Sequence, residues 1–282
     1  MDLKKTIRKI IPARVILARG YRRYYGRKLN LKDPKLFTEK IAWLKLYDHD
    51  PAYCQMVDKI QMKKFVSDKL GGDDHVVPLL GQWGRFEDID FDSLPNSFVL
   101  KANADSGSVF VVKDKNKYDF RKAKEKLTAS LHTNYYWQSR EWPYKNIKRK
   151  IFAEACLPDP EQALIDYKWF CFNGVPKVMY VGRDRGRHPT NDWYDMDGKR
   201  LNLWCADPMS DHPIDAVPLF DVMKSISEKL SAGIPFVRVD FYVVSGIAYV
   251  GELTFFHNGG FIKFHPEEWD EIFGKWLVLP KK

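Results

Sequence analysis

The chain has 282 residues, a formal net charge of +9 and a pI of about 9.2. A hydrophobic fraction of 45% and an aromatic fraction of 15% exclude a globally disordered chain, and the length is enough to bury one large core or two smaller ones. The positive charge favours an acidic partner, which could be nucleic acid, anionic lipid, acidic polysaccharide or a nucleotide. The four cysteines form no CxxC pair and predict neither a zinc site nor a disulfide framework.

The N-terminal segment is basic, because residues 4–28 contain ten Lys or Arg and no acidic residue. Apolar residues follow a rough helical spacing that is interrupted at Pro12, which predicts a helix broken or restarted there. No apolar run is long enough for a signal peptide or a membrane span, so we expect a cytoplasmic protein. The basic helix either packs on the body of the protein or makes a peripheral contact with an anionic membrane at its inner face.

Helical and strand patterns alternate along the rest of the chain. Hairpin turns are expected at ANADSGS, at Asn173–Gly174 and at Ser245–Gly246, because these residue types favour tight turns. The loop-rich stretch 184–213 is typical of an exposed substrate loop rather than of a core element. The expected helices are 37–48, 57–70, 119–131 and 219–231. The expected strands are 76–81, 98–101, 109–112 and 151–157, with two more within 166–185 and two within 237–256.

Lys101 is one candidate for a phosphate-binding site. It ends a predicted strand and precedes the small-residue loop 102–108. A fixed cation beside a pliable loop, whose amides approach phosphate oxygens, is a nucleotide-binding arrangement. The alternative is the solvated end of an ordinary hairpin, since the spacing matches neither the Walker motif nor the dinucleotide-binding motif.

Asp240 and Glu252 are a second candidate site. They lie near facing ends of two predicted antiparallel strands and have apolar or aromatic neighbours. Two buried carboxylates repel each other, and a bridging Mg²⁺ with oxygen ligands relieves that repulsion. The alternative is a structural ion pair between Arg238 and one of the two acids. From this segment alone both interpretations stand.

The order of these motifs resembles the ATP-grasp superfamily over about residues 55–275. In that superfamily a Lys-containing helix precedes a strand, a glycine loop and a strand with a second Lys, followed by a hinge with Glu, a basic position, and Asp and Glu on metal-binding strands. The matching segments are VDK at 57–59, FVLKANADSGS at 98–108, IFAEACL at 151–157, DYKWF at 166–170, RVDFY at 238–242 and GELTF at 251–255. The strings DYKWFCFNG, RVDFY, GELTFF and PEEWD are similar to the TupA-like group, which is associated with teichuronopeptide and capsular polysaccharide gene sets.

The resemblance implies an α/β (α+β) fold in which two subdomains grip ATP between antiparallel sheets. The implied division has a basic helical N-terminal region at 1–55, a lobe with the phosphate loop at 56–155 and a lobe with the magnesium site at 156–282.

The resemblance also implies roles for individual residues, with ATP and Mg²⁺ as the bound groups. Lys59 and Lys101 would hold the α- and β-phosphates. The loop that folds over the phosphates would contain Ser106, Gly107 and Ser108. The adenine hinge would consist of Glu154 and the backbone of Ala155, Cys156 and Leu157. The transferring phosphate or an acidic substrate would be contacted by Lys168, by Arg183 or Arg185 at the next strand end, and by Arg238.

Asp240 and Glu252 would bind one or two Mg²⁺ by the same resemblance. Thr254 stands where the wider superfamily usually has a metal-binding Asn, so the third ligand would be the Thr254 hydroxyl or Asn258. The same Asn258, within HNGG, also fits a residue that shapes a turn. The loop 102–108 departs from the closer group, for which we expect a histidine.

The implied activity is ligation of a carboxylate and an amine. A carboxylate attacks the γ-phosphate of ATP to give an acylphosphate, and an amine then forms the amide. The implied substrates are a uronic acid of a cell-surface polysaccharide or its precursor and an amino acid or other amine, with no nucleic acid partner. Three alternatives are a sugar or glycan kinase, a glycosyltransferase using DMD at 195–197 as its metal site, and a non-catalytic binder of acidic polymer through residues 4–28.

Overall fold

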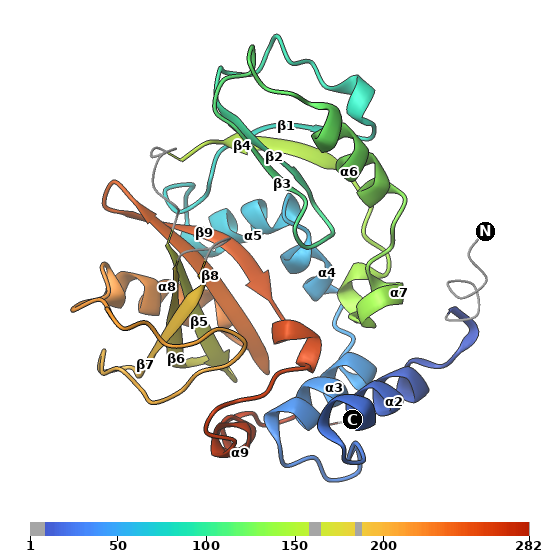
Figure 1. Ribbon diagram of the computed structural model, residues 1–282, viewed down its shortest axis with the longest axis vertical. Coiled ribbons are helices and arrows are strands. Elements are labelled where there is room, and N and C mark those ends of the chain that lie inside the picture. Colours follow the sequence, from blue (N-terminus) through green and yellow to red (C-terminus); the bar gives the residue numbers. More distant parts are fainter. Residues whose placement is uncertain (1–8, 158–164, 184–187, 282) are drawn as a thin grey trace.

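The computed structural model describes residues 9–157, 165–183 and 188–281 (Figure 1). Its mixed α/β fold contains two antiparallel sheets, which confirms the expected fold class. The smaller sheet has the order β1-β4-β2-β3, with β1 at Leu79–Trp83, β4 at Ile151–Ala155, β2 at Phe98–Ala102 and β3 at Val109–Val112. The larger sheet has the order β7-β6-β5-β8-β9, with β7 at Thr190–Tyr194, β6 at Val175–Arg183, β5 at Asp166–Phe172, β8 at Phe236–Val244 and β9 at Ile247–Thr254.

The smaller sheet has an apolar core of its own. Residues of β2 alternate between buried and partly exposed, and Phe98 and Leu100 are fully buried, as expected for a strand covered on one face. Helix α6 (Arg121–Leu131) contributes Ala123 and Leu127 to the same cluster. Figure 1 shows α6 lying along this sheet.

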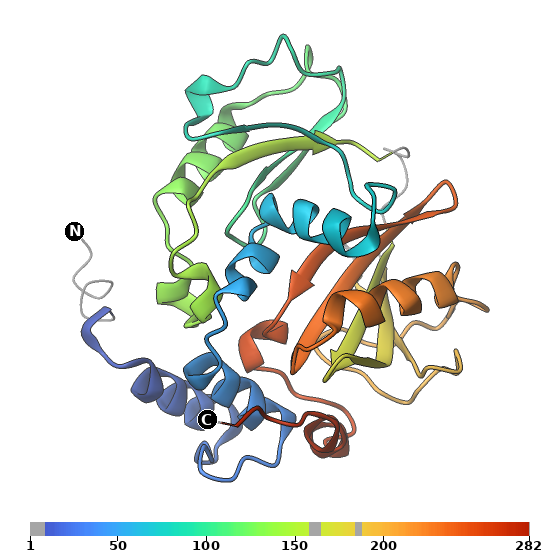
Figure 2. The same ribbon diagram turned by 180° about the vertical axis from the view of Figure 1, so that it is seen from behind.

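Both faces of the larger sheet are buried, so its central strand β5 is apolar over most of its length. Helix α8 (Phe220–Ser231) covers one face, as Figure 2 shows, and Cys171 of β5 contacts the Ser227 carbonyl of that helix. On the other face Phe172 and Phe236 of the sheet pack against Phe37. Phe37 opens helix α3 (Phe37–Tyr47), so this helix is part of the larger core.

The N-terminal helices are attached to the C-terminal end of the chain. Helix α2 (Ala13–Tyr25) begins directly after Pro12, at the predicted restart, and buries Leu17 and Tyr21. Helix α9 (Glu268–Trp276) passes so close to the segment before α3 that a Cβ on Gly274 would lie 2.1 Å from the Lys35 carbonyl oxygen.

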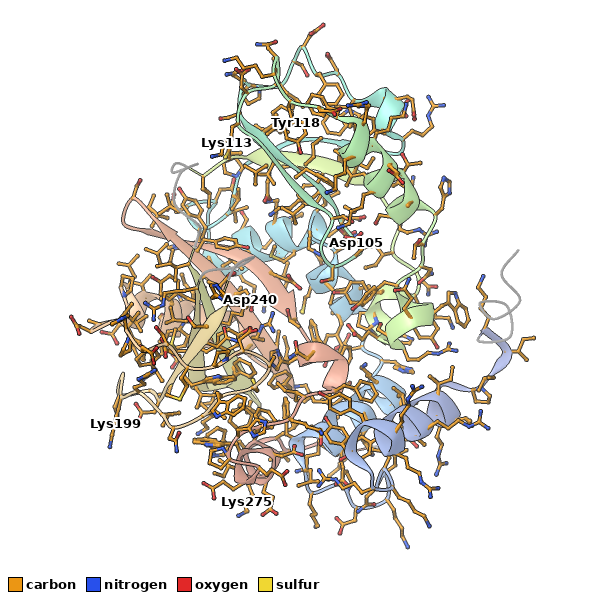
Figure 3. All side chains as sticks on the ribbon, viewed as in Figure 1. Asp105, Lys113, Tyr118, Lys199, Asp240 and Lys275 are labelled. Atoms are coloured by element: carbon orange, nitrogen blue, oxygen red, sulfur yellow. The ribbon has the colours of Figure 1, made fainter. Side chains whose placement is uncertain are left out.

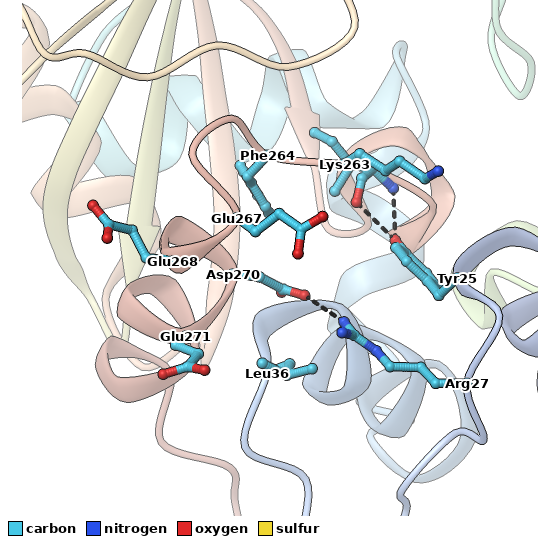
Figure 4. Close-up of a pocket in the computed structure, with 10 residues that line it drawn as sticks. Tyr25, Arg27, Leu36, Lys263, Phe264, Glu267, Glu268, Asp270 and Glu271 are labelled. Atoms are coloured by element: carbon cyan, nitrogen blue, oxygen red, sulfur yellow. Dashed lines mark hydrogen bonds and ion pairs between the residues drawn. The ribbon is translucent and has the colours of Figure 1, made fainter.

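Hydrogen bonds reinforce this attachment. The Tyr25 hydroxyl accepts from the Ile262 backbone N–H at 2.8 Å, and Arg27 donates to Asp270 at 3.3 Å (Figure 4). Asp270 also accepts from the Thr38 backbone N–H at 2.9 Å, which links α9 to the first turn of α3.

The helix expected at 57–70 begins later, at Gln61, and a separate short helix precedes it. Helix α4 (Ala52–Val57) ends just before Asp58, and α5 (Gln61–Leu70) begins three residues later. Asp58 is buried and its carboxylate accepts from the Ile60 backbone N–H at 2.9 Å. This bond is an alternative to the helical hydrogen bonds and interrupts the helix.

The expectation of an exposed loop over 184–213 is wrong for its middle part. Residues Thr190–Tyr194 form β7, an edge strand paired with β6, and Asp192 and Trp193 are completely buried. Asp192 is buried because Arg183 and Arg200 donate to its carboxylate at 2.7 and 2.6 Å. Buried carboxylates require such partners. The polar composition of residues 184–213 does not show that the partners are present.

The two predicted hairpin turns in the larger sheet are confirmed. Asn173–Gly174 and Ser245–Gly246 each place two successive residues at positive φ, as two-residue hairpin turns require. No helix among the described residues is both long enough and apolar enough to cross a bilayer. The expected boundaries at 55/56 and 155/156 stay predictions.

Candidate functional site

A cavity of about 500 Å³ lies between the two sheets. One wall comes from Lys59, Lys101 and the loop after β2, and another from β8 and β9. The third comes from segment 135–144 and from the short helix η3 (His257–Gly260). Figure 3 shows Asp105 of the loop and Asp240 of β8 on the two sides of this region.

Hydrogen bonds from three side chains hold the loop after β2 in place. Lys59 donates to the Asp105 carbonyl at 2.6 Å, and the Asp105 carboxylate accepts from the hydroxyls of Ser108 and Ser130. Ser106 and Gly107 line the cavity, whereas Ser108 is buried beneath the loop. The structure therefore brings Lys59, Ser106 and Gly107 to the cavity and leaves the Ser108 side chain outside it.

Lys101 reaches the cavity wall beside a buried carboxylate. It forms an ion pair with Glu154 of β4, which also accepts from Lys63 at 2.7 Å. Burial alone raises the pKa of Glu154, but the two ammonium groups outweigh burial and hold this pKa below its ordinary value. Glu154 thus acts as the counterion of two lysines, and Lys63 was not predicted as part of this arrangement.

The expected adenine hinge lies at the end of β4. Ala155 donates its backbone N–H to the Pro78 carbonyl at 2.9 Å, and Cys156 and Leu157 are partly buried. Burial raises the pKa of the Cys156 thiol. Among the described residues, the lining of the 500 Å³ cavity includes none of the four hinge residues.

Asp240 is the centre of a buried charge cluster. Its two carboxylate oxygens each accept from the Arg238 guanidinium at 2.6 Å, and Lys168 of β5 forms an ion pair with the same group. Burial would raise the pKa of Asp240, but Arg238 and Lys168 outweigh it and lower the pKa to about 2. Asp240 is 3% exposed and lies behind Arg238 and Lys168, which line the cavity.

His257 forms a hydrogen bond with Arg238. The Arg238 guanidinium donates to His257 Nδ1 at 2.6 Å, and because arginine only donates, the ring proton is on Nε2. Burial first, and the charge of Arg238 second, hold the pKa of His257 well below its ordinary value. The imidazole is therefore neutral and keeps the guanidinium in place.

The residues expected to bind Mg²⁺ present oxygen atoms on the cavity wall, where Arg238 also donates to the Thr254 hydroxyl at 3.1 Å. Glu252 lies directly opposite Asp240 in the strand register and accepts from the Thr254 hydroxyl at 3.1 Å. Glu252, Thr254 and Asn258 all line the cavity. Asp240 would join them only by giving up bonds to Arg238 or Lys168. No group of three or more His, Cys, Asp or Glu side chains in the described ranges is close enough to hold a metal ion.

The other expected cation positions lie elsewhere. Arg183 pairs with Asp192 and donates to the His212 carbonyl at 2.7 Å, and it does not line the cavity. Arg185 lies outside the described residues.

The cavity also contains residues that were not predicted from the sequence. Its third wall is lined by Glu141, Tyr135 and Tyr144, and no local motif marks them.

Asp166 is a further acid that was not predicted. It lies two residues before Lys168 on β5, 3.4 Å from the Lys168 ammonium. The alternation of side chains along a strand puts both on one face, so the spacing in DYK was a usable signal.

Comparisons with known proteins give one family match. A family model described as TupA-like ATPgrasp matches residues 39–278. No match was found among curated proteins.

Solved structures with a similar chain path include three ligases. D-alanine–D-alanine ligase from Bacillus anthracis, complexed with ATP, is 18% identical over 71% of this chain and 54% of that chain, with a TM-score of 0.41. L-amino acid ligase from Bacillus licheniformis is 12% identical over 79% of this chain and 49% of that chain, with a TM-score of 0.47. D-alanine–D-alanine ligase from Helicobacter pylori is 14% identical over 86% of this chain and 69% of that chain, with a TM-score of 0.43. The chain spans about half the length of the first two.

Asp240→Asn is expected to destabilise the fold by about 3 kcal/mol at pH 7, because it leaves Arg238 and Lys168 buried without their counterion. The pKa of Asp240 is depressed to about 2 from 3.8, so its stabilising effect is present above pH 4 and is lost as the pH falls towards 2. The stability difference between wild type and variant should therefore shrink over that window in urea unfolding curves.

Asp68→Asn is the matched control, since Asp68 forms an exposed pair with Lys64 and such pairs contribute little. A difference for Asp240→Asn that stays constant from pH 7 to pH 3 would contradict the assignment.

Proposed function

Because this chain belongs to the TupA-like ATP-grasp family, we propose that it is an ATP-dependent carboxylate–amine ligase. The observation that carries this proposal is the cavity between the two sheets. Lysines from the α4–α5 turn and from β2 meet Lys168, Arg238 and Glu252 of the other sheet there. Cations on both walls suit a polyphosphate that must be held while one phosphoryl group is transferred.

ATP would lie with its phosphates at Lys59, Lys101 and the loop of Ser106 and Gly107. Gly107 has a φ of +86°, so a side chain there would strain the backbone of the loop that lines the cavity. The Glu154 ion pair supports this placement because it holds the Lys101 ammonium on the wall. The adenine would extend towards the end of β4 near residues 154–157.

Glu252, Thr254 and Asn258 would hold Mg²⁺, and Asp240 would act mainly through the cations that it orients. Bound Mg²⁺ would neutralise negative charge on the phosphate oxygens. Lys168 and Arg238 would stabilise the charge that develops when a substrate carboxylate oxygen attacks the γ-phosphorus and ADP leaves. Their positions are set before any ligand binds, which is the arrangement that favours charge stabilisation.

The proposed acid substrate is a uronic acid of a surface polysaccharide or its precursor. Lys168 and Arg238 provide a cationic wall for its carboxylate, and the chain's net charge of +9 suits an acidic polymer. The neutral amine then attacks the carbonyl carbon of the acylphosphate, the carbon–nitrogen bond forms, the carbon–oxygen bond to phosphate breaks, and inorganic phosphate and one proton from the nitrogen leave.

The glycosyltransferase alternative has little support at its candidate metal site. The carboxylate of Asp195 in DMD accepts from the backbone N–H groups of Asp197 and Lys199 at 3.0 and 2.8 Å. These bonds shape the turn that ends in Gly198, as polar turn residues commonly do.

Lys101→Ala and Glu252→Gln should each weaken binding of ATP with Mg²⁺ by about tenfold or more, because each removes a charged contact. Isothermal titration calorimetry of ATP in excess Mg²⁺ measures the effect. Lys124→Ala is the control, since Lys124 is an exposed lysine of the same lobe paired with Glu87. Equal affinity in wild type and both site variants would refute the ATP site.

Wild type should convert D-glucuronate or D-galacturonate, ATP and hydroxylamine into a hydroxamate, with ADP and phosphate released in equal amounts. Hydroxylamine traps an acylphosphate, so hydroxamate reports the ligase intermediate, and mass spectrometry with a phosphate assay detects both products. Phosphate retained on the sugar without hydroxamate would instead establish the kinase.

A peripheral membrane contact through α2 is a second proposal. Arg14, Arg19, Arg22 and Arg23 are all exposed on this helix. Residues 1–8 of the basic segment lie outside the described residues. A row of exposed arginines attracts anionic lipid, with each cation adding about 1 kcal/mol near a charged surface.

Reversing three of these charges, Arg19→Glu, Arg22→Glu and Arg23→Glu together, should lower binding to phosphatidylglycerol vesicles about tenfold or more in a co-sedimentation assay. A matched reversal of the exposed Lys117, Lys122 and Lys124 controls for net charge. Equal loss in both triple variants, or equal binding of wild type to phosphatidylcholine vesicles, would contradict a specific contact.

A further inference from the structure

The third wall of the cavity contains a carboxylate, that of Glu141. Glu141 is 5% exposed yet lines the cavity together with Tyr135 and Tyr144. It stands in the short segment between helix α7 (Tyr136–Ser139) and η2 (Trp142–Tyr144). The neighbouring residue across this wall is Gly259, where an added Cβ would lie 3.7 Å from Glu141 Oε1.

Lys45 is the cation beside Glu141, but its hydrogen bonds go to other groups. Lys45 of α3 is almost fully buried and donates to the carbonyls of Ser139 and Gly259 at 2.9 and 2.7 Å. Its ammonium lies 3.8 Å from Glu141 Oε1, beyond hydrogen-bond distance. Lys45 therefore balances the charge of Glu141 and fixes the two backbone segments around it, while the carboxylate keeps capacity for another donor.

Two tyrosines line the same wall of the cavity as this carboxylate. Tyr135 and Tyr144 pack with ring centroids 5.1 Å apart, and neither hydroxyl makes a hydrogen bond to the part of the chain that the structure describes. Aromatic faces and an anionic oxygen together are the surroundings that an alkylammonium group prefers.

The other acids of the cavity wall are assigned elsewhere. The Asp105 carboxylate is occupied by two serine hydroxyls. Glu252 belongs to the residues proposed to hold Mg²⁺. Lys101 and Lys168 have their own carboxylates in Glu154 and Asp240. Among the described residues that line the cavity, Glu141 is then the acid left for a cation from solution if Glu252 binds Mg²⁺ as proposed.

We propose that Glu141, with Tyr135 and Tyr144, forms the subsite that binds the protonated amine substrate, and that Lys45 is its positioning residue. This inference rests on the proposed ligase function. The ammonium would donate to the Glu141 carboxylate and to the two hydroxyls, and it would pass one proton to that carboxylate before the nitrogen attacks. The substrate class is a primary alkylamine or amino acid derivative that is cationic at neutral pH.

The test compares a charged nucleophile with a neutral one. Glycinamide is largely an ammonium ion at pH 7, whereas hydroxylamine is largely neutral. With whichever uronic acid yields hydroxamate, kcat/KM is measured for both nucleophiles in wild type and in Glu141→Gln. The ratio of glycinamide to hydroxylamine should fall about tenfold or more in the variant, as expected for loss of a charge-assisted hydrogen bond.

Glu39→Gln is the matched control. Glu39 is another buried glutamate, 6% exposed, whose carboxylate accepts from the Lys35 and Leu36 backbone N–H groups away from the cavity. Its ratio should equal that of wild type. An unchanged ratio in Glu141→Gln, or an equal fall in both variants, would overturn the subsite.

Lys45→Met and Lys40→Met test the positioning role. Lys40 lies on the same helix and donates to two carbonyls in the same way, those of Gly274 and Leu277 at 2.8 and 2.6 Å. The nucleophile ratio should fall in Lys45→Met and stay at the wild-type value in Lys40→Met. Equal ratios in the two variants would reject Lys45 as the positioning residue.

A measurement on wild type alone covers the case in which Glu141→Gln does not fold. Methylguanidinium, a cation without nucleophilic reactivity here, should inhibit competitively against glycinamide, and neutral acetamide should not. Absent inhibition, or equal inhibition by both, would overturn the subsite. Failure of wild type to form any hydroxamate would refute the ligase function itself, which separates the two conclusions.

Discussion

The buried contact of Asp240 with Arg238 and Lys168 sets the positions of the cations in the cavity. It joins two neighbouring strands, because Lys168 is on β5 and Asp240 is its partner in the register on β8. Buried charges are tolerated only when they are paired and hydrogen-bonded, so each cation has a restricted position. The catalytic cations of the proposed reaction are thereby held before a substrate arrives, and neutral His257 keeps Arg238 from the other side.

Lysines that donate to backbone carbonyls organise the remaining walls. Lys59 holds the loop at Asp105, and Lys45 holds both Ser139 and Gly259. These segments have no sheet or long helix to position them, so an ammonium group with several donors satisfies their carbonyls instead. Helix α3, remote in sequence from the loop and strand motifs, becomes part of the site by this means.

Sequence patterns predicted most of the secondary structure, because alternation and turn chemistry are local. The Ser245–Gly246 turn sets the register of β8 and β9 as far as the pair Phe241 and Val250, and an irregularity beyond that pair shifts the register so that Asp240 lies opposite Glu252. The failure at 184–213 has an equally physical cause. Asp192 has the composition of a surface residue, but two arginines make its complete burial tolerable.

The sequence by itself determined the order of the motifs and the pairing of β8 with β9, and through these the ATP-grasp family, whereas the register shift that aligns Asp240 with Glu252 was not encoded in the turn. Only the tertiary structure decided which charged residues pair. From the sequence, Glu154 could face solvent, a nucleotide or Lys63, and separation along the chain does not distinguish these alternatives. The tertiary structure also brought Glu141 and Lys45 to the cavity wall, 96 positions apart by their residue numbers. Such pairings depend on how helices pack against a sheet, a long-range property that no local spacing encodes.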